Sequence, residues 1–98
     1  MQLAQSGTPI NITSTGAVSK SATPASAPGT LIGFYVNNKN VGATLVLTHG
    51  IAAGGAAITG TITPLIGWHE LRVYCPSGAY ATIAVDAMNI TFFYAAGG

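Results

Sequence analysis

The sequence predicts an all-β fold, a small antiparallel β-sandwich or barrel of jelly-roll-like form. Apolar residues recur at every second position through most of the chain, and no window keeps a 3.6-residue period beyond two turns. Gly, Pro and Asn clusters separate the alternating segments at intervals of about 10–12 residues, which is typical of small β-domains. The 98 residues are enough for one small domain. We therefore expect about six to eight short strands and an extended N-terminal arm.

The first third of the chain is expected to form this arm. It is rich in Ser, Thr, Ala and Pro. Apolar and polar residues alternate only weakly over residues 9–13, and the segment 17–20 is short. Each segment therefore predicts at most a peripheral strand. Two prolines exclude a helix from residues 21–29, because proline lacks the amide hydrogen that a helix or sheet needs. The predicted domains are an arm with one or two peripheral strands over residues 1–29, and a β-sandwich core over residues 30–98.

From residue 30 onward, β-branched and aromatic residues alternate with polar residues in six segments, each ending at residues that favour turns. The predicted strands cover residues 30–37, 42–49, 57–63, 68–74, 79–85 and 88–94. The side chains expected to face the core are those of Ile32, Phe34, Val36, Leu45, Leu47, Ile58, Ile62, Leu71, Val73, Ile83, Val85, Ile90 and Phe92.

Charged residues make up only 5% of the chain, against about 25% in a typical domain. The five are Lys20, Lys39, Glu70, Arg72 and Asp86. This composition excludes intrinsic disorder, coiled coils and nucleic-acid binding, all of which need more charge. It also leaves strand edges without the lysines that usually prevent association. With a net charge of +1, the chain is expected to associate with itself, as a homodimer or homotrimer.

The sequence predicts neither an enzyme nor a catalytic, cofactor or metal site. Zinc needs three or four protein ligands, and the two histidines, His49 and His69, have no recognised ligand spacing with other candidates. No G-x-S-x-G motif is present, and nothing brings the two carboxylates together. Cys75, the only cysteine, is expected to be a small buried hydrophobe. Without a disulfide, the chain is expected to fold in a reducing cytoplasm.

Three further sequence features have simpler structural explanations. Residues 41–58 are apolar enough to suggest a membrane span, but glycines interrupt them, so two strands around a loop are preferred and no membrane partner is expected. The Gly-rich loop at residues 50–55 lacks the Lys-Ser/Thr ending of a phosphate-binding loop. For the Trp68-His69-Glu70 cluster, we expect Trp68 to open a strand and Glu70 and Arg72 to pair on its outer face.

The candidate interface residues are mostly aromatic. Tyrosine and tryptophan are favoured at protein interfaces because they combine a large apolar body with a polar tip. An extended arm can also add a strand to a neighbouring sheet. The candidates are Pro9, Ile10 and Ile12 in the arm, with Tyr35, Trp68, Tyr74, Tyr80 and Tyr94. An aromatic sugar-binding surface is the alternative interpretation of Trp68 and the tyrosines.

Four segments carry a resemblance to a known group of proteins. They are GTLIGFYVN at residues 29–37, GTITPLIGWH at 60–69, YATI at 80–83 and NITFFY at 89–94. Over residues 29–95 the chain resembles small uncharacterised all-β structural proteins of tailed bacteriophages. The resemblance implies a virion protein made in the host cytoplasm, with the group's head decoration (cement) proteins as the leading expectation. Its partners would be itself and a major capsid protein or other virion protein.

The resemblance leaves other roles open. A tail, fibre or connector component is the alternative within the virion, and a small carbohydrate-binding module is the alternative outside it. The resemblance assigns no catalytic or binding residue to this chain.

Overall fold

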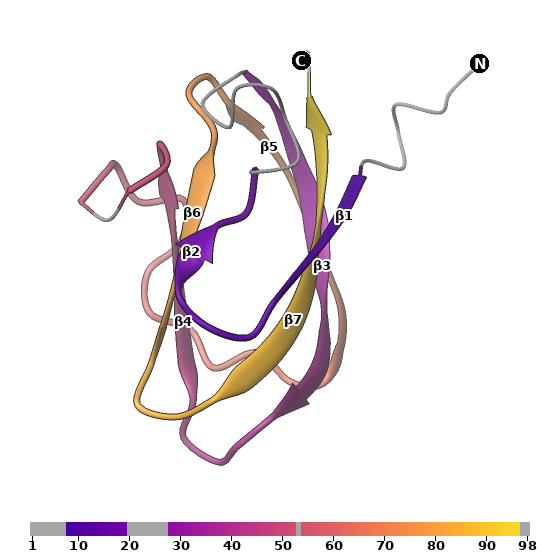
Figure 1. Ribbon diagram of the computed structural model, residues 1–98, viewed down its shortest axis with the longest axis vertical. Helices are drawn as coiled ribbons and strands as arrows, with labels where there is room; N and C mark the ends of the chain where they lie inside the picture. Colours follow the sequence, from indigo (N-terminus) through magenta and orange to yellow (C-terminus); the bar gives the residue numbers. More distant parts are fainter. Residues whose placement is uncertain (1–7, 20–27, 53, 97–98) are drawn as a thin grey trace.

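The computed structural model describes residues 8–19, 28–52 and 54–96. In these residues the chain forms seven strands in two antiparallel sheets (Figure 1), which confirms the predicted sandwich-like all-β fold. The strands are β1 (Thr8–Ile12), β2 (Gly16–Ala17), β3 (Gly29–Lys39), β4 (Thr44–His49), β5 (Gly67–Cys75), β6 (Ala79–Ala84) and β7 (Met88–Ala96). This part of the chain holds no helix that could span a membrane.

The two sheets alternate along the chain. The four-stranded sheet has the order β1-β7-β3-β5, and the three-stranded sheet has the order β2-β6-β4. Each connection between consecutive described strands therefore passes from one sheet to the other. All of the strand pairing is consequently between segments that are distant in the sequence.

The described part of the predicted arm belongs to both sheets of its own chain. β1 pairs antiparallel with β7, and β2 pairs with β6. Ile12 and Val18 are buried in the core. These strands are peripheral in position, yet β1 and the turn after β2 supply core side chains. Residues 20–27, which make up most of the predicted linker and include Lys20, lie outside the described residues.

Alternate side chains from both sheets fill the space between them, as the period of two predicted. Most of the predicted inward residues are buried or pack against the core. The core also contains side chains that the pattern did not select. The additional buried residues include Leu31, Ala43, Ala79, Ala81, Met88 and Tyr94.

Val85 was predicted to face the core, and that prediction is wrong, because its side chain is 80% exposed. β6 ends at Ala84, and the amide of Asp86 donates to the Ala84 carbonyl at 2.8 Å. This closes a γ-turn around Val85, whose φ is 72°. The turn rotates the side chain out of the alternation that the preceding strand follows.

The strand predicted over residues 57–63 is also not formed. This segment forms only two isolated β-bridges with β4, Leu45 with Ile62 and Thr48 with Ala57. The two bridges are three residues apart on β4 but five residues apart on the segment. The two stretches therefore cannot form a regular ladder. The amides of Ile58 and Thr59 instead both donate to the Leu47 carbonyl, at 2.7 and 3.1 Å.

β5 contains a bulge at its centre. Gly33 pairs with Glu70 and Leu31 pairs with Val73, so three steps along β5 oppose two along β3. Arg72 lies within the longer stretch and has a φ of 58°. Such a bulge increases the local twist of an edge strand.

Candidate interaction surface

The outer side of β5 carries a row of exposed side chains, which we call the β5 row: Trp68, Glu70, Arg72 and Tyr74. The alternation that turns His69, Leu71 and Val73 towards the core side turns these four towards solvent. Trp68 is 45% exposed and Tyr74 is 56% exposed.

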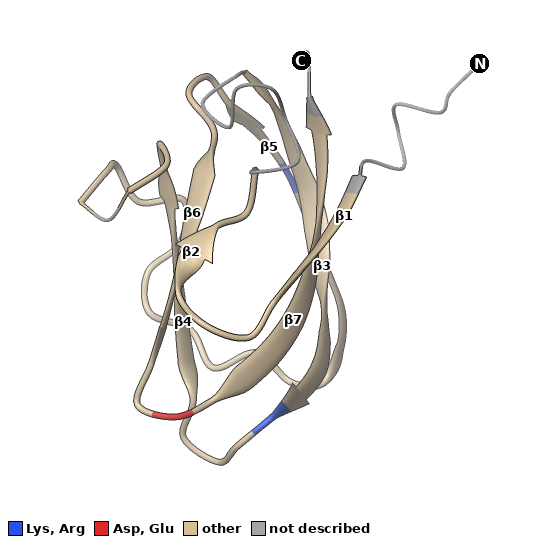
Figure 2. Cartoon of the chain, in the orientation of Figure 1, with Lys and Arg blue, Asp and Glu red and all other residues tan. Residues whose placement is uncertain are grey.

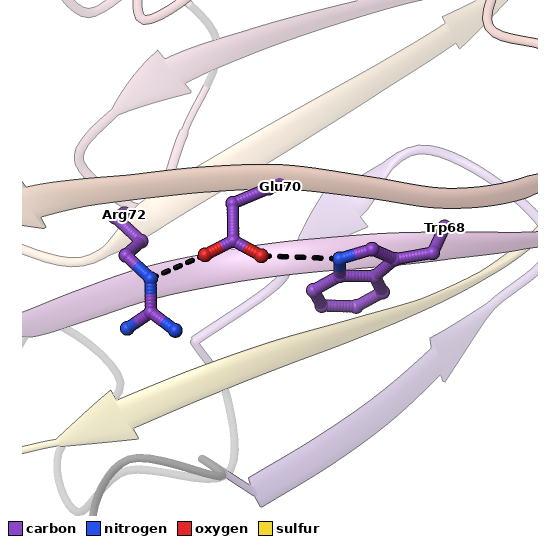
Figure 3. A network of polar contacts seen from close by, with 3 residues as sticks. All are labelled: Trp68, Glu70 and Arg72. Atoms are coloured by element: carbon purple, nitrogen blue, oxygen red, sulfur yellow. Dashed lines mark hydrogen bonds and ion pairs between the residues drawn. The ribbon is translucent and has the colours of Figure 1, made fainter.

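The first three residues of the β5 row are joined by polar contacts (Figure 3). The indole Nε1 of Trp68 donates to Glu70 Oε1 at 3.1 Å, and Arg72 Nε donates to Glu70 Oε2. The hydrogen bond from Arg72, then that from Trp68, holds the pKa of the Glu70 carboxyl below its ordinary value. The contacts orient the indole, and the charges of Glu70 and Arg72 neutralise each other. Because the pair is exposed, it adds little to stability.

Trp68 rests on a glycine of the neighbouring strand. A Cβ at Gly33 would lie 2.8 Å from the indole atoms Cη2 and Cζ2, so the benzene part of the indole covers this position. Phe93 of β7 packs edge-on against the indole, with ring centroids 5.6 Å apart. Tyr35, 44% exposed, is the direct β3 neighbour of Trp68. Trp68, Tyr35 and Phe93 thus form an aromatic patch on the outer face.

A second cluster lies next to this patch on the same face. The Asn11 amide donates to Asn89 Oδ1 at 2.7 Å and to Thr91 Oγ1 at 3.1 Å. The Asn37 amide donates to the same two acceptors, at 3.2 and 2.9 Å. We call these four residues the amide cluster. It connects β1, β7 and β3 without any formal charge.

The candidate interface residues divide into exposed and buried groups. Tyr35 and Trp68 are neighbours on the outer face, and Tyr74 is exposed on the same face at the other end of β5. Pro9 is exposed on β1. Tyr80 is partly buried on β6 of the other sheet, and Ile10 packs against the core.

Two of the candidates are core residues, which corrects their assignment to an interface. Ile12 and Tyr94 are 5% and 0% exposed, so they present no surface to another molecule. The hydroxyl of Tyr94 donates to the Cys75 carbonyl at 3.4 Å. Burial raises the pKa of Tyr94 to about 12, with further contributions from Cys75 and Tyr74.

Sequence reasoning missed the amide cluster, Gly33 and Phe93. Each of these residues is unremarkable alone, and their association depends on the registers of β1 with β7, β7 with β3 and β3 with β5. The β3–β7 register shifts by one residue between Leu31 and Gly33 and again between Val36 and Asn38. Only the alternation of Asn89 and Thr91 with apolar neighbours signalled a polar outer face on the last strand.

The residues considered for chemistry are spread over the fold. His69 stacks on Phe34 with centroids 5.0 Å apart, and its Nε2 lies 2.7 Å from the Leu65 carbonyl oxygen. His49 lies on the opposite sheet. Cys75 is buried, as predicted, and this burial raises the pKa of its thiol. Within residues 8–19, 28–52 and 54–96, no three His, Cys, Asp or Glu residues gather in a group that could hold a metal ion.

Charge in the described residues is confined to two places (Figure 2). The Glu70–Arg72 pair lies on β5. Lys39 and Asp86 belong to the opposite end of the fold, where Asn40 donates to Asp86 Oδ1 at 2.9 Å and, with the Ala87 amide, lowers the pKa of that carboxyl. An open hollow of about 150 Å³ at this end is lined by residues that include Asn38, Lys39 and Asn89.

Comparisons of the chain with protein-family models, with curated proteins and with solved structures found no match. The resemblance to phage structural proteins therefore remains a prediction from the sequence.

Proposed function

We propose that this chain is a structural virion protein of a tailed bacteriophage, and that it decorates the capsid by binding the head surface as an oligomer. The proposal assigns no chemical reaction to the protein. It rests on the sequence resemblance together with the character of the outer face of the four-stranded sheet.

The observation that carries the proposal is the pairing of exposed aromatic side chains with an almost uncharged surface. Tyr35, Trp68 and Tyr74 are exposed on one face, and the only charges of the β5 row neutralise each other. Aromatic side chains that are held in place lose little entropy on binding and supply most of the contact energy of many interfaces. A low charge also removes the repulsion that keeps free domains apart.

The test uses heads of the encoding phage, purified from a strain in which the gene is deleted. We expect the protein to sediment with these heads and to saturate at a fixed number of copies per head. Trp68→Ala and Tyr35→Ala should weaken binding at least tenfold. Tyr80→Ala, on the other sheet, should not. Binding to tails but not heads would assign the protein to a tail, fibre or connector instead.

One observation favours a second candidate, a small carbohydrate-binding module. The Trp68 indole and the amide cluster lie on the same face with Tyr35 between them, so a ring that could stack on a sugar shares this face with amides that could bond to its hydroxyls. A glycan array distinguishes the two candidates. Signal that Trp68→Ala abolishes would support the carbohydrate-binding module, and an array without signal would reject it.

A further inference from the structure

We infer that β5 is a dimerisation edge, through which two copies of this chain pair antiparallel about a two-fold axis at Leu71. The two four-stranded sheets would then join into one continuous sheet of eight strands. This inference deepens the proposed function by naming the partner of β5 as a second copy, and it rests on the proposed oligomer.

β5 offers the longest unpaired edge among the strands that the structure describes. It spans nine residues and pairs only with β3. The other three edges are less suitable. β1 has five residues and carries Pro9, which cannot donate to a ladder. β2 has two residues, and β4 is partly covered by the bridges to Ala57 and Ile62. Unpaired amides and carbonyls along an edge are a template for another strand.

The side chains of β5 are arranged so that the strand is complementary to a second copy of itself about Leu71. Glu70 precedes it and Arg72 follows it, and further out Trp68 on one side corresponds to Tyr74 on the other. In a two-fold antiparallel pairing centred on Leu71, Glu70 of each copy therefore lies opposite Arg72 of the other. Opposite charges and aromatic side chains that face each other across antiparallel strands both stabilise the pairing.

Charge also disfavours the neighbouring registers. Centring the axis on Glu70 would set the two Glu70 carboxylates against each other, and centring it on Arg72 would do the same with the two guanidinium groups. An axis midway between residues would place outer side chains of one copy against inner side chains of the other. The Leu71-centred register alone opposes unlike charges and keeps both outer faces on the same side, as expected for an isologous two-fold interface.

The bulge in β5 lies at the axis of this register, so the ladder between the two copies would be interrupted there and would form on either side of it. The departure from extended backbone lies at Arg72, next to the axis. The regular pairing with β3 covers residues 67–70 and 73–75, on either side of it. In the dimer, residues 67–70 of one copy would pair mainly with residues 73–75 of the other. The two bulges would face each other at the axis, and the four charges would form one neutral group.

Sedimentation equilibrium of the full chain at low ionic strength tests the inference. We expect a dimer for the wild type. Glu70→Arg and Arg72→Glu should each raise the dimer dissociation constant at least tenfold, because each sets like charges across the axis. Lys39→Glu makes the same change in charge as Arg72→Glu at the far end of the fold, and it should leave the dissociation constant unchanged. Circular dichroism checks that all variants fold.

Mixing the Glu70→Arg and Arg72→Glu variants distinguishes the effect of charge pairing between copies from the effect of the ion pair within one copy. Each single variant has like charges at positions 70 and 72, so its own ion pair is lost in any mixture. An equimolar mixture of Glu70→Arg and Arg72→Glu restores unlike charges only between chains. We therefore expect a heterodimer with a dissociation constant within about threefold of the wild-type value.

A wild-type monomer or trimer, or a mixture that stays monomeric, would overturn the inference. The head-binding test stands apart from this outcome. A wild-type monomer that saturates heads would retain the capsid-decoration role and remove both the oligomer and the β5 dimer. A dimer that shows the expected charge dependence but binds neither heads nor tails would support the β5 dimer and contradict the proposed function.

Discussion

Gly33 determines how Trp68 lies on the outer face, because a single hydrogen atom separates the β3 backbone from the indole there. Gly33→Ala would place a methyl group 2.8 Å from the indole ring and closer still to the backbone carbonyl oxygen of His69 on β5. Both the indole and the β5 backbone must then shift away from β3. We expect a loss of about 1–3 kcal/mol in the free energy of unfolding, the usual cost of overpacking. Urea unfolding measures this loss.

The emission of Trp68, the only tryptophan of the chain, should shift in the same variant. Gly60→Ala is the matched control, because a Cβ at Gly60 meets nothing within 4 Å. Equal stability of the two variants and the wild type would show that the indole does not need the glycine.

Protonation of Glu70 at acidic pH should be visible in the fluorescence of Trp68, because the two side chains are hydrogen-bonded. The hydrogen bonds from Arg72 and Trp68 lower the pKa of the folded carboxyl, so their contribution is fully present above the unfolded pKa. It is lost as the pH falls through the folded pKa. We expect Trp68 emission to titrate with a midpoint below 4.5, the ordinary value. Glu70→Gln should remove this transition, and a midpoint at or above 4.5 would contradict the geometry.

At the scale of elements, β1 shows that the N-terminal region is part of the fold. Ile12 faces Ile90 of β7 and is 5% exposed. Ile12→Ala should cost about 2–5 kcal/mol of unfolding free energy in chemical denaturation, the range for truncating a buried isoleucine. Ile66→Ala makes the same truncation at a position that is 60% exposed, and it should cost far less. Similar losses in both would place Ile12 outside the core.

The strands themselves were predictable because alternation and turn residues are local properties. Six of the observed strands overlap a predicted strand over most of their length, and β2 overlaps the weak segment 17–20 at Ala17. The failures arise where hydrogen bonds override a local pattern. Residues 57–63 alternate as a strand should, yet two extra residues opposite β4 prevent a ladder. Val85 continues the alternation of β6 but occupies a γ-turn.

The candidate surface was only half predictable for a related reason. The exposed aromatic residues and the Glu70–Arg72 pair follow from the alternation within one strand. In contrast, the contact of Trp68 with Gly33 and the hydrogen bonds of the amide cluster join residues on strands that are distant in the sequence. Register shifts between β3 and its two neighbours, β5 and β7, set which residues lie side by side, and a single sequence does not specify these shifts.

At the scale of the whole molecule, the alternation between sheets governs how the chain folds. The described residues contain no hairpin of consecutive paired strands, so each sheet must close long loops before it gains a hydrogen bond. We therefore expect folding in milliseconds to seconds, as for other domains with mainly non-local pairing. Stopped-flow refolding followed by Trp68 emission measures this rate. Refolding within about 100 microseconds would contradict the expectation.

The pairing of β1 with β7 also fixes the mechanical behaviour of the domain. Thr8 lies opposite Tyr94 at one end of the paired strands, so tension applied between Thr8 and Tyr94 would separate β1 from β7 one residue pair at a time. Their hydrogen bonds would break in sequence instead of sharing the load. The direction that separates β1 from β7 at this end is thus the mechanically weak direction of the domain. A force applied across the broad faces of the two sheets would not load these hydrogen bonds in sequence.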